Sequence, residues 1–267
     1  MGLSGLVQLN LELTSKCSKR TLCSMCAHQN PEKHPYLKFG DMDFELLRSI
    51  RNQLEPGPTL EYHRDGDSVD YPRLADALDL FDGFITVLVT HGERLAEKAD
   101  EIINRCTSVC VSVLWTDPDY EIQFDSVRKF LERKGERAPQ VIIKFVGAIP
   151  KPNPYLELPV RMTTRALHIP DGNWKYAHNK LPLMPESGIC SDFLGRPVID
   201  WQGRLFQCVK FDPNSDGMLG SLNENTLDEL WNGPKRKAWL EAHKIGRRDL
   251  ASGLCKNCLY WGVPSEA

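Results

Sequence analysis

The stretch VQLNLELTSKCSKRTLCSMC, residues 7–26, decides the fold of this 267-residue chain. Residues 7–13 alternate apolar and polar side chains, which predicts a β-strand with one buried face. Three cysteines, Cys17, Cys23 and Cys26, follow within a single loop. In α/β folds, ligands lie at the C-terminal ends of parallel strands. A cysteine loop directly after a first strand therefore predicts a cofactor site at that edge of a sheet.

Strand and helix patterns alternate from this loop to about residue 147. Further strands are predicted at 60–62, 84–89, 109–114 and 141–146, and helices at 41–54, 72–80, 95–103 and 124–133. Asp41 or Asp43 is expected to cap the first helix. A short sixth strand is expected at 165–169. Such alternation predicts a parallel sheet with right-handed crossovers, here a partial (β/α)6 barrel of the TIM type.

The pattern changes after the proline-rich connector at 147–158. Residues 198–206 predict a β-hairpin with Gly203 in its turn. Thr226 and Glu229 form a capping-box signature that predicts a helix through about Leu240. These elements indicate a small C-terminal α+β domain, and we expect a division into residues 1–185 and 186–267.

The composition is that of an ordinary globular protein, with 41% hydrophobic and 26% charged residues. A net charge of -3 gives no basic footprint for nucleic acid. No apolar run reaches the length of a membrane span, and the first residues lack the pattern of a secretory signal. Nine cysteines, an odd number, argue for metal binding or catalysis in a reducing compartment, which we expect to be the cytoplasm.

The first cysteine group has the ligand number of a reactive iron–sulfur centre. Three thiolates can hold three irons of a [4Fe–4S] cluster and leave the fourth iron open. The alternative is a structural zinc site, for which His28 would supply a fourth ligand.

These residues resemble the radical S-adenosylmethionine (SAM) superfamily. The strand end Leu11-Glu12-Leu13-Thr14, followed by Cys17, Cys23, Met25 and Cys26, is similar to that family's first strand and cluster loop. The resemblance implies reductive cleavage of SAM, with Met25 near the adenine. The spacing between the first two cysteines departs from the usual family pattern by two residues.

The resemblance extends to five further positions of a SAM site. Gly66 and Asp67 match a stretch that holds the amino group of SAM, with aspartate in place of the family's glutamate. Thr90 matches a position at the end of the third strand, and Ser112 a serine on the fourth. Arg128 matches an arginine of the following helix. The plain alternatives are a turn, sheet hydroxyls and a surface charge.

The second cysteine group consists of Cys190, Cys208, Cys255 and Cys258, which are separated by 18, 47 and 3 positions. Four thiolates make a closed metal centre, and by themselves they would indicate a zinc ribbon. With the segment 218–231, the group resembles the shortened SPASM, or twitch, domain of the superfamily. That resemblance implies a second [4Fe–4S] cluster, either for outer-sphere electron transfer or as a structural staple.

Candidate substrate residues stand where strands are expected to end. Arg165 and His168 are favoured as catalytic groups because a short strand there aims one of them at the cavity. Cys110 shares a strand face with Ser112 and is a candidate hydrogen-atom donor, although a buried structural cysteine is the default. His63, Arg64, His91 and Lys144 are further candidates.

The family resemblance implies an enzyme that receives an electron from a flavodoxin or ferredoxin and forms a 5′-deoxyadenosyl radical. In the spacing of its second cysteine group and in its length, the chain resembles members of the superfamily that oxidise an alcohol on a sugar or cyclitol. That resemblance implies the same reaction, with the second cluster accepting an electron. Radical modification of a peptide is the main alternative. A non-enzymatic iron–sulfur or zinc protein is the third interpretation. Neither a membrane nor a nucleic acid is expected as a partner.

Overall fold

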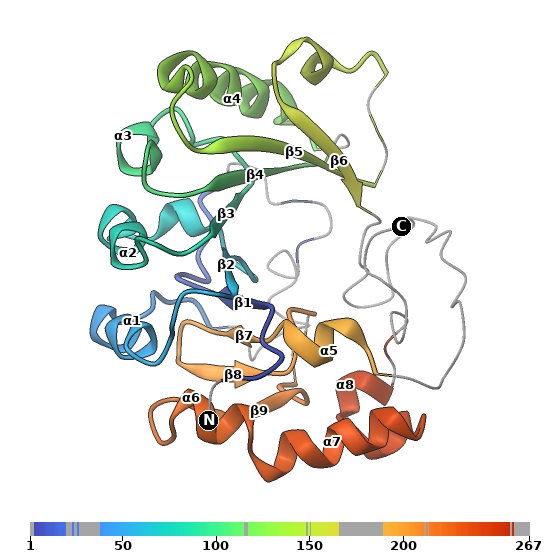
Figure 1. The fold of residues 1–267 in the computed structure, drawn as a ribbon. Coiled ribbons are helices and arrows are strands. Elements are labelled where there is room, and N and C mark those ends of the chain that lie inside the picture. Colours follow the sequence, from blue (N-terminus) through green and yellow to red (C-terminus); the bar gives the residue numbers. More distant parts are fainter. Residues whose placement is uncertain are drawn as a thin grey trace.

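The computed structural model describes residues 3–19, 23, 26, 38–114, 117–147, 149, 151–165, 189–210, 212, 214–256 and 258. Within these residues, one sheet has the strand order β6-β5-β4-β3-β2-β1-β7-β8-β9. Neighbours from β6 to β1 are all parallel, and their helices cover one face of the curved sheet (Figure 1). The two edge strands do not pair, so the barrel is open. The predicted partial barrel is confirmed.

The strands and helices follow the predicted alternation. The strands of the barrel are β1 (Gln8–Leu11), β2 (Thr59–Tyr62), β3 (Thr86–Thr90), β4 (Ser108–Val113), β5 (Gln140–Val146) and β6 (Arg161–Arg165). The helices between them are α1 (Phe44–Arg51), the 3-10 helix η2 (Ser68–Asp70), α2 (Leu74–Leu80), α3 (Ala99–Ile102), α4 (Tyr120–Lys134) and the 3-10 helix η3 (Pro154–Glu157).

The first helix shows why these segments fold as they do. Asp43 caps α1 by accepting hydrogen bonds from two amides of its first turn. Phe44, Leu47 and Ile50 lie three residues apart and bury one stripe of the helix against the sheet. The hydrophobic core therefore lies between the sheet and α1–α4, and the other face of the sheet is left to line the barrel interior.

The sixth strand lies earlier in the chain than predicted. It spans Arg161–Arg165 and pairs with β5 from Ile142↔Arg161 to Val146↔Arg165, whereas we expected a strand at 165–169. As an edge strand of sequence RMTTR, it buries little of either face, so it carries no hydrophobic periodicity that a sequence pattern could reveal. Residues 166–169 lie outside the described ranges.

The C-terminal part continues the barrel sheet. Its strands are β7 (Val198–Ile199), β8 (Arg204–Phe206) and β9 (Met218–Ser221), and its helices are α5 (Ser191–Gly195), α6 (Leu227–Trp231), α7 (Pro234–Lys244), the 3-10 helix η4 (Arg248–Leu250) and α8 (Gly253–Lys256). β7 pairs in parallel with β1 and antiparallel with β8. Gly203 has a φ of 80° in the predicted hairpin turn.

The predicted capping box is present, but its helix ends early. Thr226 and Glu229 bond each other's backbone reciprocally at the start of α6. The helix stops at Trp231, and a second helix begins at Pro234, where we expected one helix through Leu240. Proline lacks an N–H and clashes inside a helix, but it suits the first position of a new one. Among the described residues, no helix is long and apolar enough to cross a membrane.

Candidate functional site

The first cysteine group gathers at the C-terminal end of β1. The N–H of Cys26 donates a hydrogen bond of 2.8 Å to the carbonyl of Cys23. The three thiols lie close enough to influence one another's ionisation: burial, Asp67 and Cys26 raise the pKa of Cys17 to about 12. Burial and neighbouring acids, including both other cysteines, also raise the pKa of Cys23. Thiols crowded in this way suit a metal centre, which takes them as thiolates. Met25 and His28 lie outside the described residues.

Gly66 allows the turn after β2 to pack directly on the chain that enters the cysteine loop. A Cβ atom at this position would lie 2.3 Å from the carbonyl oxygen of Thr14 and 2.6 Å from that of Lys16. The N–H of Asp67 donates to the same Lys16 carbonyl at 2.8 Å. The close backbone approach predicted for Gly66 is therefore present, and its partner is the protein's own cluster loop.

Asp67 joins the ends of β2 and β3. One of its carboxylate oxygens accepts from the N–H of Val69 at 3.0 Å. The other accepts from the Thr90 hydroxyl at 2.9 Å and the His91 N–H at 2.8 Å. The side chain is almost fully buried, and burial raises its pKa. Asp67 and Thr90 thus contact each other at the C-terminal ends of β2 and β3. Both carboxylate oxygens of Asp67 already have donors within the protein.

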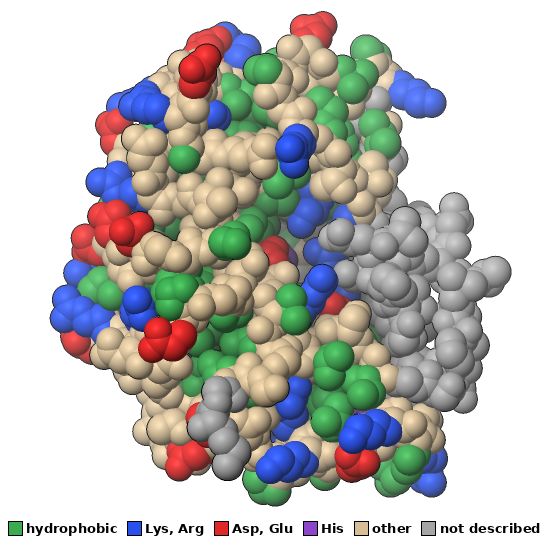
Figure 2. Space-filling model, in the orientation of Figure 1, with side chains coloured by type: hydrophobic (Ala, Val, Ile, Leu, Met, Phe, Trp, Pro, Cys, Tyr) green, Lys and Arg blue, Asp and Glu red, His purple; other side chains and the backbone are tan. Residues whose placement is uncertain are grey.

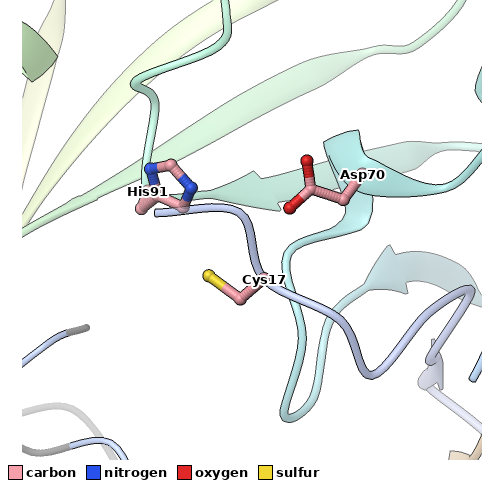
Figure 3. A group of neighbouring side chains, drawn as sticks. All are labelled: Cys17, Asp70 and His91. Atoms are coloured by element: carbon pink, nitrogen blue, oxygen red, sulfur yellow. The ribbon is translucent and has the colours of Figure 1, made fainter. Parts of the chain in front are cut away.

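An imidazole and a carboxylate stand beside the first cysteine. Figure 3 shows Cys17 facing His91 and Asp70, and the potential ligand atoms of the three all lie within 4.8 Å of one another. The His91 Nε2 atom lies 3.1 Å from Asp67 Oδ2, and the Ser18 backbone and hydroxyl both donate to Asp70. The sequence analysis missed Asp70, whose signal is its position three residues after Asp67.

A buried lysine in the cysteine loop forms ion pairs with acids outside the loop. The Nζ atom of Lys19 lies 3.4 Å from Glu93 and 3.6 Å from both Asp117 and Asp119, and its side chain is 4% exposed. These acids follow β3 and β4, so one cation connects the loop to two strand ends. We gave Lys19 no role from the sequence; a lone lysine between the first two cysteines was the available signal.

Several predicted residues share the interior face of the barrel. Ser112 pairs with Lys144, and Arg165 pairs with Val146, two residues further along the same face of β5. Cys110 lies on this face too, two residues before Ser112. Arg165, Cys110 and Ser112 thus lie on one face of the sheet, whereas His168 lies outside the described residues.

Charge is concentrated on this face. Burial, followed by the charges of Arg165 and Lys144, lowers the pKa of His63 to about 3. Burial raises the pKa of Cys110, while a hydrogen bond and the charge of Lys144 oppose that rise. These mutual effects show that side chains from β2, β4, β5 and β6 converge.

A second charged group connects the barrel to the β7–β8 hairpin. Glu12 accepts hydrogen bonds from the Asp65 N–H at 3.2 Å and the Trp201 N–H at 3.3 Å. Arg64 lies over the Phe206 ring at 4.0 Å, with its guanidinium 3.7 Å from Asp200. Burial, together with the Asp65 charge, raises the pKa of Glu12 to about 8.

The second cysteine group lines a single pocket. Cys190, Cys208, Cys255 and Cys258 all face it, together with Lys210 and its ion-pair partner Asp192. Burial and the neighbouring cysteines raise the pKa values of Cys208 and Cys255. The four sulfurs are thus gathered as a closed metal centre requires.

One predicted cofactor contact is wrong. Arg128 lies on the exposed side of α4, where it pairs with Asp125 at 2.8 Å and Glu132 at 2.6 Å. The plain alternative, a surface charge with helical i,i+3 and i,i+4 partners, is the one that holds.

Comparison with known proteins supports the second cysteine site and the fold. Residues 190–259 match SPASM, an iron–sulfur cluster-binding domain. A crystal structure of BtrN in complex with AdoMet and 2-DOIA has a TM-score of 0.60 at 18% identity, covering 98% of this chain and 96% of that chain. Native anSMEcpe with bound AdoMet has a TM-score of 0.64 at 14% identity, covering 95% of this chain and 87% of that chain. No curated protein matches significantly.

Proposed function

We propose that this chain, whose fold and C-terminal iron–sulfur domain are those of the radical SAM superfamily, oxidises an alcohol of a sugar or cyclitol. The observation that carries the proposal is the pairing of a three-cysteine loop after β1 with a four-cysteine pocket in a matching iron–sulfur domain. The similarity to BtrN in complex with AdoMet and 2-DOIA extends over nearly the full length of both chains, and it supports a small-molecule substrate.

The residues around the first loop are assigned to the cluster and to SAM. When bound, a [4Fe–4S] cluster with an open iron supplies the electron, taken from a flavodoxin or ferredoxin, that splits SAM into methionine and a 5′-deoxyadenosyl radical. Cys17, Cys23 and Cys26 hold the cluster. The SAM side of the site consists of Met25, Gly66, Asp67, Thr90 and Ser112. Asp67 acts there by fixing Thr90 and His91 rather than by offering a free carboxylate.

Oxidation of an alcohol to a carbonyl removes one hydrogen atom, one proton and one electron. The hydrogen atom would leave with the radical that SAM supplies, and the proton would go to a side chain. A cluster held by Cys190, Cys208, Cys255 and Cys258 would supply the acceptor for the electron. Arg165, His168 and Cys110 are the residues proposed to act on substrate from the interior face. Outer-sphere electron transfer suits the second cluster because four thiolates leave no open iron.

Peptide modification is the second candidate. It is supported by the similarity to anSMEcpe with bound AdoMet and Kp18Cys peptide, which has a TM-score of 0.58 at 13% identity. A non-enzymatic iron–sulfur or zinc protein is the third, and SAM cleavage separates it from both enzymes.

The test is SAM cleavage by anaerobically reconstituted protein under strong reductant. We expect about eight irons per chain and formation of 5′-deoxyadenosine. A triple variant with Cys17→Ala, Cys23→Ala and Cys26→Ala should lose cleavage and keep about half the iron. Cys106→Ala, which removes a buried cysteine outside both groups, should retain both. A zinc-rich colourless protein, or undiminished cleavage by the triple variant, would refute the proposal.

A further inference from the structure

Two cations, Lys144 and Arg165, lie on the interior face of the barrel. Lys144 and Arg165 lie on neighbouring parallel strands and near the C-terminal ends, where ligands of this fold bind. Among the residues that the structure describes, no carboxylate lies within ion-pair distance of either side chain. Both side chains are only half-buried, so part of each is open to solvent.

Other charges of this region have partners of their own. Glu61 accepts a hydrogen bond from the neutral Gln8 side chain and its charge acts on Cys110, and Arg64 has Asp65 and Asp200 beside it. Figure 2 shows lysine and arginine side chains around the hollow at the centre of this face, with acidic side chains among them. Lys144 and Arg165 therefore make their end of this face positively charged, as their effect on His63 shows.

We propose that Lys144 and Arg165 bind an anionic group of the substrate, either a carboxylate or a phosphate. This inference rests on the proposed function and narrows its substrate class to acidic sugars or cyclitols. An arginine fork and a lysine ammonium on adjacent strands provide charge-assisted hydrogen bonds to anionic oxygens. They would repel an ammonium group, so an amino sugar is disfavoured.

The test measures binding of three sugars with the same ring to the cluster-loaded protein with SAM, by calorimetry. D-glucuronate carries a carboxylate, D-glucose 6-phosphate a phosphate, and D-glucosamine an ammonium. We expect at least one acidic sugar to bind at least tenfold more tightly than glucosamine. Lys144→Met and Arg165→Met should each weaken that binding about tenfold or more, as loss of a charge-assisted hydrogen bond does.

Controls separate this inference from the proposed function. Lys144→Arg keeps the charge and should bind within a few-fold of the parent protein, and Arg128→Met removes a surface charge and should bind as the parent does. SAM binding and 5′-deoxyadenosine formation are measured on the same samples. Three results would contradict the anion site while leaving the radical SAM assignment intact, provided that SAM binds. The acidic sugars could bind no more tightly than glucosamine, they could fail to bind, or their affinity could be unchanged in both methionine variants.

A different observation concerns the second cysteine group. His243 is fully buried and stacks on Phe193 with ring centroids 4.3 Å apart. The N–H of Cys190 donates to its Nδ1 atom at 3.3 Å, so the ring proton belongs on Nε2, which lies 3.5 Å from the Cys255 sulfur. The side-chain amide of Gln207 donates to the same sulfur at 3.0 Å.

We infer that His243 and Gln207 raise the reduction potential of the cluster proposed for this pocket. Reduction adds negative charge, and hydrogen bonds to a ligand sulfur stabilise that charge. A higher potential suits a cluster that accepts an electron from substrate. His243 thus acts through the Cys255 sulfur rather than on substrate. The hydrogen bond from the Cys190 N–H fixes its tautomer.

The experiment is a redox titration followed by electron paramagnetic resonance, in the triple-alanine background that lacks the first cluster. His243→Phe keeps the ring stack and removes the donor, and Gln207→Leu removes the amide. We expect each to lower the midpoint potential at unchanged iron content, and Gln202→Leu, at the hairpin turn, to leave it unchanged. Equal potentials in parent and both variants at full iron would overturn the inference; absence of any second-cluster signal would overturn the proposed function instead.

Discussion

Glu12 carries a buried carboxyl whose charge state joins two parts of the molecule. It accepts hydrogen bonds from the turn after β2 and from the hairpin after β7. Burial is the main reason that its pKa rises from 4.5 to about 8, with Arg64 opposing the rise. The folded protein therefore keeps a proton at neutral pH that the unfolded chain releases.

This pKa predicts how stability depends on pH. Between pH 4.5 and about 8 the folded state holds one more proton at Glu12 than the unfolded state, so this residue's contribution to the unfolding free energy falls as pH rises. Glu12→Gln removes that term. Urea denaturation measures the unfolding free energy of the variant and of the parent. The value for the variant minus that for the parent should increase from pH 5 to pH 8 and stay level above pH 8. A difference that is flat with pH would contradict the prediction.

At the scale of elements, the turn after β2 and the loop after β1 form one packed unit. Gly66 touches the backbone of Thr14 and Lys16, and Asp67 bonds both that backbone and the end of β3. Three strand ends are thus fixed around Cys17 by main-chain contacts and by the Asp67 carboxylate. The close approach of the main chains leaves no room for a side chain at Gly66.

Gly66→Ala should disturb this unit. Overpacking of this kind costs about 1–3 kcal/mol, and we expect the displaced loop to hold less iron at the first cysteine group, with the second group unaffected. Gly57→Ala is the matched control, because a Cβ atom there would meet nothing within 4 Å. Unfolding curves and iron analysis of both variants provide the measurement. Equal iron and stability in Gly66→Ala and Gly57→Ala would show that the packing is not tight.

At the scale of the whole molecule, the barrel and the C-terminal part share one sheet. β1 lies between β2 and β7, and the Asn10 side chain, fully buried, donates to the Pro197 carbonyl at 3.0 Å. The C-terminal part that carries the second cysteine group is therefore hydrogen-bonded to the first strand of the barrel.

Loss of the second metal centre should lower the stability of the entire chain in a single transition. We expect Cys208→Ala to reduce the melting temperature recorded by circular dichroism and calorimetry together, since structural metal sites contribute folding energy. At this size each kcal/mol lost lowers Tm by about 2–4 °C. Two separate transitions, with the barrel melting as in the parent, would contradict the shared-sheet interpretation.

The sequence by itself determined the chemistry and the order of elements. Cysteine spacing is a local feature, and so is the alternation of strand and helix periods, because each depends on residues close together in the chain. The local signal failed at β6 because that strand takes its place from pairing with β5. The helix after Thr226 breaks at Pro234, a local signal that the prediction did not use.

Only the tertiary structure decided which side chains face one another. Nothing in the sequence pairs Asp67 with His91, sets Lys144 beside Arg165, places His243 against Cys255, or adds β7 to the edge of β1. Each of these contacts joins residues that the register of a sheet or the packing of a helix brings together across long stretches of chain. Their energies depend on burial and distance, which exist only once the chain has folded.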